Sequence, residues 1–487
     1  MLIIGLDREE NEYMVRGLVM SFFPHQEFGV DLTPVQELTQ EQKKDRLQVE
    51  QDRITYYDTE GSEYTEGYVR SSEGDKLSIE DCRALERAVY AALSRATHIS
   101  LPWGILTGVR PTKLPMAMLC DGMEDAGIIA RLEREFYISP QKAATATDIA
   151  RRELKLLNEI DYKNGYSLYI GIPFCPTICL YCSFSAYPLA AWKTRVDDYL
   201  DALEREMIAA GEMFKDRKLQ AVYVGGGTPT SLSPEQLTRL CAMVHKYFDM
   251  SHVREFTVEA GRPDCTDAEK LYAIKAGGAD RVSVNPQSMQ QRTLDLIGRR
   301  HSVEQVVETF ERARKIGFEN INMDIILGLP GETEADVADT LQKIAALKPD
   351  NLTVHSLAIK RAARLNIFWE QFAHMEMKNS DATMSLAYRT AAEMGLAPYY
   401  LYRQKNMAGN FENVGFATPG KEGLYNILIM EEVQSIVALG AGASTKAVFQ
   451  NGHIERCENV KEVAQYIDRI DEMIERKRKL FLQEDAR

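Results

Sequence analysis

The stretch Leu168-Tyr-Ile-Gly-Ile-Pro-Phe-Cys175-Pro-Thr-Ile-Cys179-Leu-Tyr-Cys182 places three cysteines directly after an apolar segment. The β-branched and aromatic residues before the first cysteine predict a buried strand. The cysteines are spaced four and then three residues apart, so one short loop brings all three thiols to a single metal centre. Cysteine thiolates are the usual protein ligands of iron–sulfur clusters. Three thiolates leave one iron of a four-iron cluster open, and an open metal position is where chemistry occurs.

A structural zinc site is the alternative interpretation of these cysteines. Such a site needs a fourth Cys or His at short spacing. The nearest downstream candidates, Cys241 and His245, lie far along the chain. A glycine triplet and a strand–helix alternation that follow the cysteines favour the iron–sulfur interpretation.

The C-x3-C-x2-C spacing resembles that of the radical S-adenosylmethionine (radical SAM) enzymes. The words Tyr169-Ile-Gly-Ile-Pro-Phe-Cys175 and Gly225-Gly-Gly-Thr-Pro-Thr230 are similar to those of the oxygen-independent coproporphyrinogen III oxidase family. The resemblance covers roughly residues 165–450. It implies a four-iron, four-sulfur (4Fe-4S) cluster and S-adenosyl-L-methionine as cofactors. In that superfamily, the methionine moiety chelates the open iron, and cleavage of the cofactor gives a 5′-deoxyadenosyl radical.

Length, charge and cysteine use limit the classes of protein that remain. A chain of 487 residues predicts more than one domain. A net charge of −14 argues against nucleic acid as a partner, because phosphate binding needs a basic face. Eight cysteines in a chain of this size do not form a disulfide framework, and an exposed cluster needs a reducing compartment. We therefore expect a cytoplasmic protein, and the pattern shows no membrane span.

Three regions are expected along the chain. Residues 1–150 form an α+β N-terminal extension of unknown role, with a strand at 2–6, a helix at 11–23 and a hairpin from strands at 47–57 and 64–70. A helix at 79–97, capped by Ser78, follows them. Residues 165–365 form the middle region, and residues 366–487 form a mainly helical C-terminal region.

The middle region alternates strands and helices with a regular period. Six strand–helix units predict an α/β fold with a parallel sheet and right-handed crossovers, and the resemblance makes this sheet a partial (β/α)6 radical SAM barrel. The strands are expected at 168–172, 221–224, 255–259, 281–285, 321–326 and 352–355. The helices are expected at 196–214, 234–249, 267–276, 303–316 and 334–347.

Unusual residues follow the carboxyl ends of these strands, where functional residues gather in parallel barrels. By resemblance, nine positions match those that contact S-adenosylmethionine: Tyr169, Gly226, Gly227, Thr228, Glu259, Gln287, Arg299, Asp324 and Ala358. Glycines allow close approach of the methionine amino group. Glu259 or Asp324 suits ribose hydroxyls, and Arg299 suits the methionine carboxylate. Cys175, Cys179 and Cys182 are the expected cluster ligands, and no residue is assigned a catalytic role.

A basic turn follows the sixth strand. It reads Ala358-Ile-Lys360-Arg361-Ala-Ala-Arg364. If the turn is helical, Arg364 neighbours both Lys360 and Arg361 and is the best candidate for a bidentate carboxylate contact. The alternative is a solvated turn that balances nearby acids.

The resemblance has two departures. The oxidases carry a fourth cysteine where this chain has Phe184, and the related haem chaperones carry a His-Asn pair where this chain has Tyr425-Asn426. The resemblance to the oxidase family implies the first hypothesis, which is oxidative decarboxylation of coproporphyrinogen III to protoporphyrinogen IX. The alternatives are a haem-binding chaperone and another radical SAM reaction on a tetrapyrrole, such as anaerobic haem opening. The resemblance implies a tetrapyrrole substrate and an electron donor such as flavodoxin or ferredoxin, and we expect a monomer.

Overall fold

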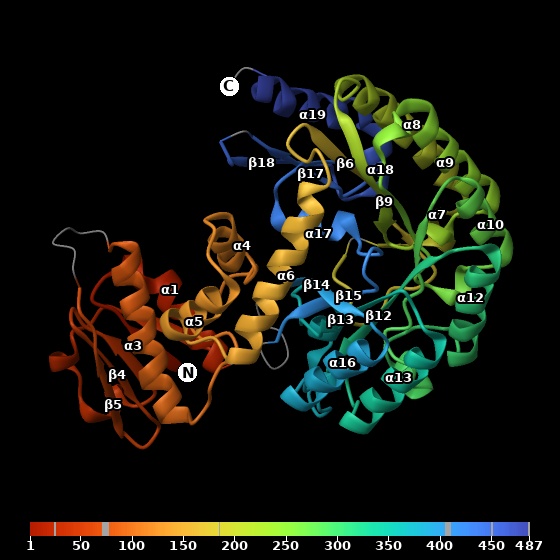
Figure 1. The fold of residues 1–487 in the computed structure, drawn as a ribbon. Coiled ribbons are helices and arrows are strands. Elements are labelled where there is room, and N and C mark those ends of the chain that lie inside the picture. Colours follow the sequence, from red (N-terminus) through yellow and green to blue (C-terminus); the bar gives the residue numbers. More distant parts are fainter. Residues whose placement is uncertain (24–25, 71–76, 185, 405–410, 450, 486–487) are drawn as a thin grey trace. The chain divides into compact units, whose positions relative to one another are not determined.

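The computed structural model describes residues 1–23, 26–70, 77–184, 186–404, 411–449 and 451–485. The chain divides into two compact units (Figure 1). The first contains Met1–Arg151 and Arg403–Asn406, and the second contains Arg152–Tyr402 and Met407–Arg487. The helix α6 (Pro140–Asn158) runs across the division between them.

The first unit is built on a five-stranded sheet in the order β2-β1-β3-β4-β5. The strands β2, β1 and β3 are parallel to one another, and β3, β4 and β5 are antiparallel neighbours. The helices α1 and α3 pack together, and α3 also packs against β4 and β5. The bounds of the strands are β1 Leu2–Gly5, β2 Phe28–Asp31, β3 Arg46–Val49, β4 Arg53–Tyr57 and β5 Glu63–Gly67. The helices are α1 Glu12–Phe22, α2 Gln40–Lys43, α3 Ile79–Thr97, α4 Lys113–Cys120 and α5 Asp125–Phe136.

Local signals account for α3 but not for the strand expected at 47–57. Ser78 and Asp81 form a reciprocal capping box that starts α3 at the expected residue. The single strand expected at 47–57 is wrong, because the chain reverses there and forms the two antiparallel strands β3 and β4. At the reversal, the backbone N–H of Glu50 donates to the carbonyl of Arg53 at 2.9 Å, in a turn that the hydrophobic pattern alone did not reveal.

The second unit is built on an eleven-stranded sheet in the order β14-β15-β13-β12-β11-β10-β9-β6-β16-β17-β18. The six expected strands β6, β9, β10, β11, β12 and β13 are parallel neighbours in chain order, which confirms the predicted fold class. Their bounds are β6 Gly165–Ile172, β9 Lys218–Gly226, β10 Glu255–Glu259, β11 Arg281–Ser283, β12 Asn320–Leu327 and β13 Asn351–Ser356.

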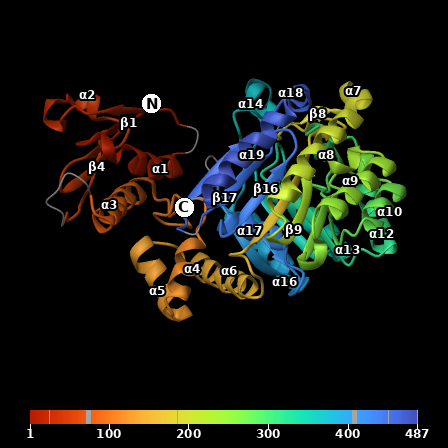
Figure 2. The ribbon, with the colours of Figure 1, turned by 90° about the horizontal axis from the view of Figure 1, so that it is seen from above.

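Helices follow these strands and cover the outer face of the sheet. Figures 1 and 2 show α8, α9, α10, α12 and α13 one after another along that face. Capping boxes start α9, α12 and α13 and fix where each crossover returns. Their bounds are α8 Val196–Met213, α9 Pro234–Tyr247, α10 Ala268–Ala276, α12 Val303–Ile316 and α13 Glu334–Leu347. The shorter helices are α7 Leu189–Trp192, α11 Gln291–Leu296, α14 Arg364–Ile367 and α15 Trp369–Phe372.

The C-terminal region contains five strands besides the expected helices, and the hydrophobic pattern did not indicate these strands. Residues from 397 onward add five strands to the two edges of the sheet, and β16 lies parallel to β6. Short hydrophobic runs there were too weakly periodic to indicate strands before their sheet partners were known. The strands are β14 Ala397–Tyr402, β15 Asn413–Ala417, β16 Ser435–Leu439, β17 Ser444–Val448 and β18 Ile454–Glu458. The helices are α16 Asp381–Glu393, α17 Leu424–Glu431, α18 Val463–Asp468 and α19 Ile470–Asp485. Across the described part of the chain, no helix is long and apolar enough to span a membrane.

Candidate cofactor site

The three cysteines lie in one loop beyond the carboxyl end of β6. Cys175 ends the short strand β7 (Phe174–Cys175), which pairs with β8 at residues 187–188. Cys175 and Cys179 are buried, and Cys182 is partly exposed. The Sγ atom of Cys175 lies 3.4 Å from the Oγ1 atom of Thr228, so the loop lies against the segment that follows β9.

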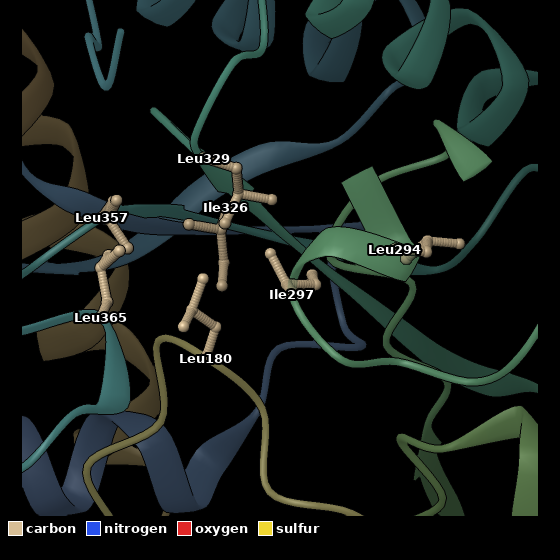
Figure 3. Close-up of a cluster of buried hydrophobic side chains, with 7 residues drawn as sticks. All are labelled: Leu180, Leu294, Ile297, Ile326, Leu329, Leu357 and Leu365. Carbon is tan, nitrogen blue, oxygen red and sulfur yellow. The ribbon is translucent and has the colours of Figure 1, made fainter. Parts of the chain in front are cut away.

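The backbone of the cysteine loop is held from two sides. The N–H of Leu180 donates to the carbonyl of Ile297 at 2.9 Å, and its carbonyl accepts from the N–H of Leu365 at 2.9 Å. The Leu180 side chain joins a buried apolar cluster with residues that follow β12 and β13 (Figure 3). The cluster contains Leu180, Leu294, Ile297, Ile326, Leu329, Leu357 and Leu365. Burying a leucine side chain contributes about 1.5–3 kcal/mol, so the packing of Leu180 helps the backbone bonds to hold the loop in place.

Each of the three thiols must lose its proton before its sulfur binds iron. Burial raises the pKa of Cys175 to about 11 and also raises the pKa of Cys182. Metal binding requires the deprotonated sulfur, so iron competes with a proton at each position. Among the described residues, no three His, Cys, Asp or Glu side chains are placed to hold one metal ion. In an iron–sulfur cluster, each cysteine binds its own iron.

Two buried arginines lie beside Cys179. The Nη1 atom of Arg262 donates to the Cys179 Sγ atom at 3.5 Å and to the carbonyl of Thr177 at 3.2 Å. Its Nη2 atom donates to Asp264 at 2.7 Å. Burial opposes the charge of Arg299, yet the neighbouring Tyr181 and Cys179 raise the pKa of this guanidinium above its ordinary value. Two guanidinium groups therefore surround Cys179, and their positive charge favours an anionic ligand at this sulfur.

The glycine triplet is required because the segment from Ile172 to Cys175 approaches it closely. A Cβ atom on Gly227 would lie 2.7 Å from the carbonyl oxygen of Phe174 and 3.0 Å from the Sγ atom of Cys175. Gly226 has φ 107°, a conformation that favours glycine. The N–H groups of Gly227 and Thr228 donate to the carbonyls of Ile172 and Phe174, each at 2.8 Å. Glycine is therefore required here for packing, whatever ligand the segment also contacts.

A pattern of partial exposure marks one line of residues across the sheet. The interiors of β6, β9, β10, β12 and β13 are buried except at Tyr169, Tyr223, Glu259, Asp324 and His355. Tyr169 and Tyr223 are direct partners in the β6–β9 register. The same side chains that the sequence marks, or their neighbours across the sheet, are thus the accessible ones on otherwise buried strands.

Three tyrosines and one glutamate form the first part of this line. The ring of Tyr223 stacks on Tyr425 of α17 with centroids 4.6 Å apart, and it stacks on Tyr169 with centroids 6.2 Å apart. The hydroxyl of Tyr223 donates to the Oε1 atom of Glu259 at 2.6 Å. Burial raises the pKa of Glu259 to about 7, although the bond from Tyr223 opposes this shift. Glu259 is thus an acceptor whose charge changes near neutral pH.

A hydrogen-bonded belt continues the line across β11, β12 and β13. The amide of Asn322 donates to the Oδ1 atom of Asp324 at 2.6 Å and to Ser283 at 2.9 Å. The hydroxyl of Thr353 donates to the side-chain Oδ1 atom of Asn322 at 3.0 Å. Burial would raise the pKa of Asp324, but His355, with Nε2 at 3.9 Å, and Asn322 hold this pKa below its usual value. Asp324 therefore remains a carboxylate that is able to accept bonds from a ligand.

Gln287 and Arg299 are buried at the end of β11. Gln287 has φ 67°, its N–H donates to the carbonyl of Asp324 at 2.9 Å, and its Oε1 atom has no hydrogen-bond partner among the described residues. An unpaired buried acceptor is costly and indicates a missing donor. Arg299 donates to the carbonyls of Asn285 and Gly261. These bonds hold the buried guanidinium of Arg299 against the segments that follow β10 and β11.

The basic turn lies near the cysteine loop, but it is not helical as the sequence argument supposed. The helix α14 begins only at Arg364, so the helical neighbour relation with Lys360 and Arg361 is wrong. The Nη1 atom of Arg364 donates to the carbonyl of Ile178 at 3.5 Å. Ala358 and Lys360 are half-buried, whereas Arg361 and Arg364 are exposed. The structure thus brings Arg364 to the rim of the cysteine loop.

Sequence reasoning missed four residues of this site. Tyr223 and His355 are polar residues within apolar runs on predicted strands, and this was the signal that could have indicated them. Tyr425 was noted only as a departure from a His-Asn pair, and Arg262 gave no local signal, because their contacts join segments far apart in the chain. Only the folded sheet brings them to the cysteine loop and the tyrosine stack.

The chain is similar to several known proteins. Residues 169–344 match the radical SAM superfamily. The oxygen-independent coproporphyrinogen-III oxidase-like protein HemZ of Bacillus subtilis is 41% identical over 401 residues, which are 81% of this chain and 80% of HemZ. The heme chaperone HemW of the same organism is 36% identical over 311 residues, 63% of this chain and 76% of HemW. The solved coproporphyrinogen III oxidase HemN of Escherichia coli is 24% identical, covers 66% of this chain and 73% of its own, and has a TM-score of 0.44.

The chain belongs to the radical SAM superfamily and, within it, to the oxygen-independent coproporphyrinogen III oxidase-like family. Members of this superfamily use a 4Fe-4S cluster and S-adenosylmethionine. The residues present fit both groups. Three thiols share one anchored loop with a cationic neighbour at Cys179, and an unpaired Gln287 oxygen lies close to the accessible carboxylates.

Proposed function

We propose that this protein is an anaerobic coproporphyrinogen III dehydrogenase, which converts two propionate side chains of its substrate to vinyl groups. The single observation that carries this proposal is the likeness to HemZ over four fifths of both chains, because it includes more than the shared radical SAM region. For each propionate, one hydrogen atom passes to the deoxyadenosyl radical, carbon dioxide is released, and one electron passes to a separate one-electron acceptor. A low-potential donor such as flavodoxin or ferredoxin would supply electrons to the cluster.

Each part of the site has a proposed role in binding. Cys175, Cys179 and Cys182 would hold the cluster, and the open iron together with S-adenosylmethionine would supply the radical that abstracts hydrogen. Glu259 and Asp324 lie in the accessible line of the sheet, where carboxylates accept bonds from ribose hydroxyls. The remaining proposed contacts of this cofactor are Tyr169, Gly226, Gly227, Thr228, Gln287, Arg299 and Ala358.

Arg364 is the proposed anchor for the carboxylates of the tetrapyrrole. The substrate is a tetracarboxylate, so an acidic chain must provide local cations. Arg364 is exposed and lies within hydrogen-bond distance of the cysteine loop, and the half-buried Lys360 precedes it by four residues. A substrate held there would have its propionates beside the cluster.

Haem transfer is the second candidate function. It is favoured by the 36% identity to the heme chaperone HemW, which extends over three quarters of that protein. A chaperone would keep the cysteine loop and bind haem but would not convert coproporphyrinogen III. The two candidates therefore differ in turnover and share the metal centre.

An anaerobic assay distinguishes the candidates. The reconstituted and reduced protein is incubated with S-adenosylmethionine and coproporphyrinogen III, and vinyl product, carbon dioxide and 5′-deoxyadenosine are measured together. The dehydrogenase proposal expects all three, and Cys179→Ala is the matched negative control. Stoichiometric haem binding without vinyl product would replace this proposal by the chaperone function.

A further inference from the structure

Arg262 is the group that distinguishes Cys179 from the other two cysteines of the loop. It is 3% exposed, and it donates to the Cys179 sulfur at 3.5 Å. By contrast, the neighbour described for the Cys175 sulfur is the neutral hydroxyl of Thr228 at 3.4 Å. One of the three proposed ligands thus has a buried guanidinium bonded to it.

The position of Arg262 is fixed on every side. Its Nη2 atom donates to the Thr177 hydroxyl at 2.9 Å and to Asp264 at 2.7 Å, and its Nε atom donates to Asp264 at 2.9 Å. Thr177 in turn donates to the carbonyl of Gly298 at 2.9 Å. A bidentate carboxylate pair holds the plane of a guanidinium. Arg262 is therefore preorganised and does not move to make its contact with sulfur.

The balance of charge around Arg262 remains positive. Arg299 lies next to Cys179 and is 5% exposed, and Asp264 is the acid that contacts Arg262. The ring of His301 is buried with its Nδ1 atom 3.8 Å from Asp264. Two guanidiniums and one carboxylate leave an excess of positive charge in a region of low dielectric, where charges interact strongly.

We infer that Arg262 raises the reduction potential of the cluster by stabilising its reduced form through the Cys179 sulfur. The inference rests on the proposed assignment of Cys179 as a cluster ligand. In the step concerned, the oxidised cluster takes one electron from a low-potential donor and gains one negative charge. Hydrogen bonds to cluster sulfurs and nearby net charge are the protein's means of setting such potentials. Asp264 acts in the opposite direction, because it offsets part of the charge of Arg262.

The test is a redox titration of the reconstituted protein without S-adenosylmethionine or tetrapyrrole. Reduced viologens supply electrons at set potentials, and the electron paramagnetic resonance signal reports the reduced cluster. Arg262→Gln is expected to disfavour reduction about tenfold, which equals a fall of about 59 mV for a one-electron couple. Arg262→Lys keeps the charge and is expected to fall less. Asp264→Asn is expected to shift the potential upward.

The opposite signs separate an electrostatic role from a structural one. Arg239→Gln is the matched control, because Arg239 on α9 also pairs with two acids but is partly exposed. The reduction potential of the cluster in this variant should equal that of the wild type. An intact cluster with unchanged potential in Arg262→Gln would overturn the inference, as would shifts of the same sign in Arg262→Gln and Asp264→Asn. If Arg262→Gln binds no iron, the upward shift in Asp264→Asn decides. A wild-type protein that binds no cluster would instead contradict the proposed function.

Discussion

Lys477 on α19 forms a buried ion pair with Glu206 on α8, and its replacement tests what holds the C-terminal helix on the sheet. The two side chains are 0% and 1% exposed, and the Nζ and Oε1 atoms are 2.6 Å apart. Lys477 also donates to the side-chain Oδ1 atom of Asn459 at 2.7 Å. Glu206 accepts further bonds from Asn459, from the N–H of Gly440 and from the hydroxyl of Tyr466, at 2.6–2.8 Å.

Lys477→Met preserves much of the side-chain volume but leaves Glu206 buried without its cation. Breaking a buried pair from one side costs about 3–5 kcal/mol. Three donors remain on Glu206, so we expect a loss of about 3 kcal/mol, near the lower limit of that range. Pulse proteolysis in urea measures this loss without assuming that both units unfold together.

Two variants control this experiment. Lys479→Met removes a lysine of the same helix whose side chain is 70% exposed, and it should change the free energy of unfolding by less than about 0.5 kcal/mol. The double variant Glu206→Gln with Lys477→Met should recover most of the loss, because the amide oxygen of Gln still accepts from the Gly440 N–H and no lone charge remains buried. Equal urea midpoints for Lys477→Met and Lys479→Met would refute the reasoning.

The remaining predictions concern the cofactor site. Cys175→Ala, Cys179→Ala and Cys182→Ala should each lose the cluster after anaerobic reconstitution, while the buried Cys241→Ala should retain it, as iron analysis and absorption will show; full iron in Cys179→Ala would contradict the ligand assignment. Arg364→Ala should weaken tetrapyrrole binding by about 1.5–3 kcal/mol while the cluster stays intact. Unchanged affinity would contradict a contact between Arg364 and the substrate carboxylates. The pKa of Glu259 is raised to about 7, so its carboxylate forms as pH rises through this value, and calorimetry should show tighter S-adenosylmethionine binding above it. Glu259→Gln should remove this pH dependence, and a wild-type affinity that is flat across neutral pH would argue against Glu259 as a ribose acceptor.

Local sequence determined the units of the fold. The helix expected at 303–316 begins and ends at those residues, because Ser302 and Gln305 cap it within one turn and Gly317 closes it. The six parallel strands were likewise predictable from short hydrophobic runs between amphipathic helices. The spacing of the three cysteines is also local, and it placed them in one loop before any partner was known. The roles of the individual site residues stay predictions.

Tertiary structure alone decided the contacts between distant segments. The strand β16 pairs with β6 from the far end of the chain, Tyr425 reaches Tyr223, and Arg262 reaches Cys179. Such pairs carry no period or cap, and each forms only after the intervening chain has closed into the sheet. A buried polar group must still find its partner, and the sequence does not say which one. The sequence therefore determined that the three cysteines share one loop, whereas the fold decided which charges surround this loop.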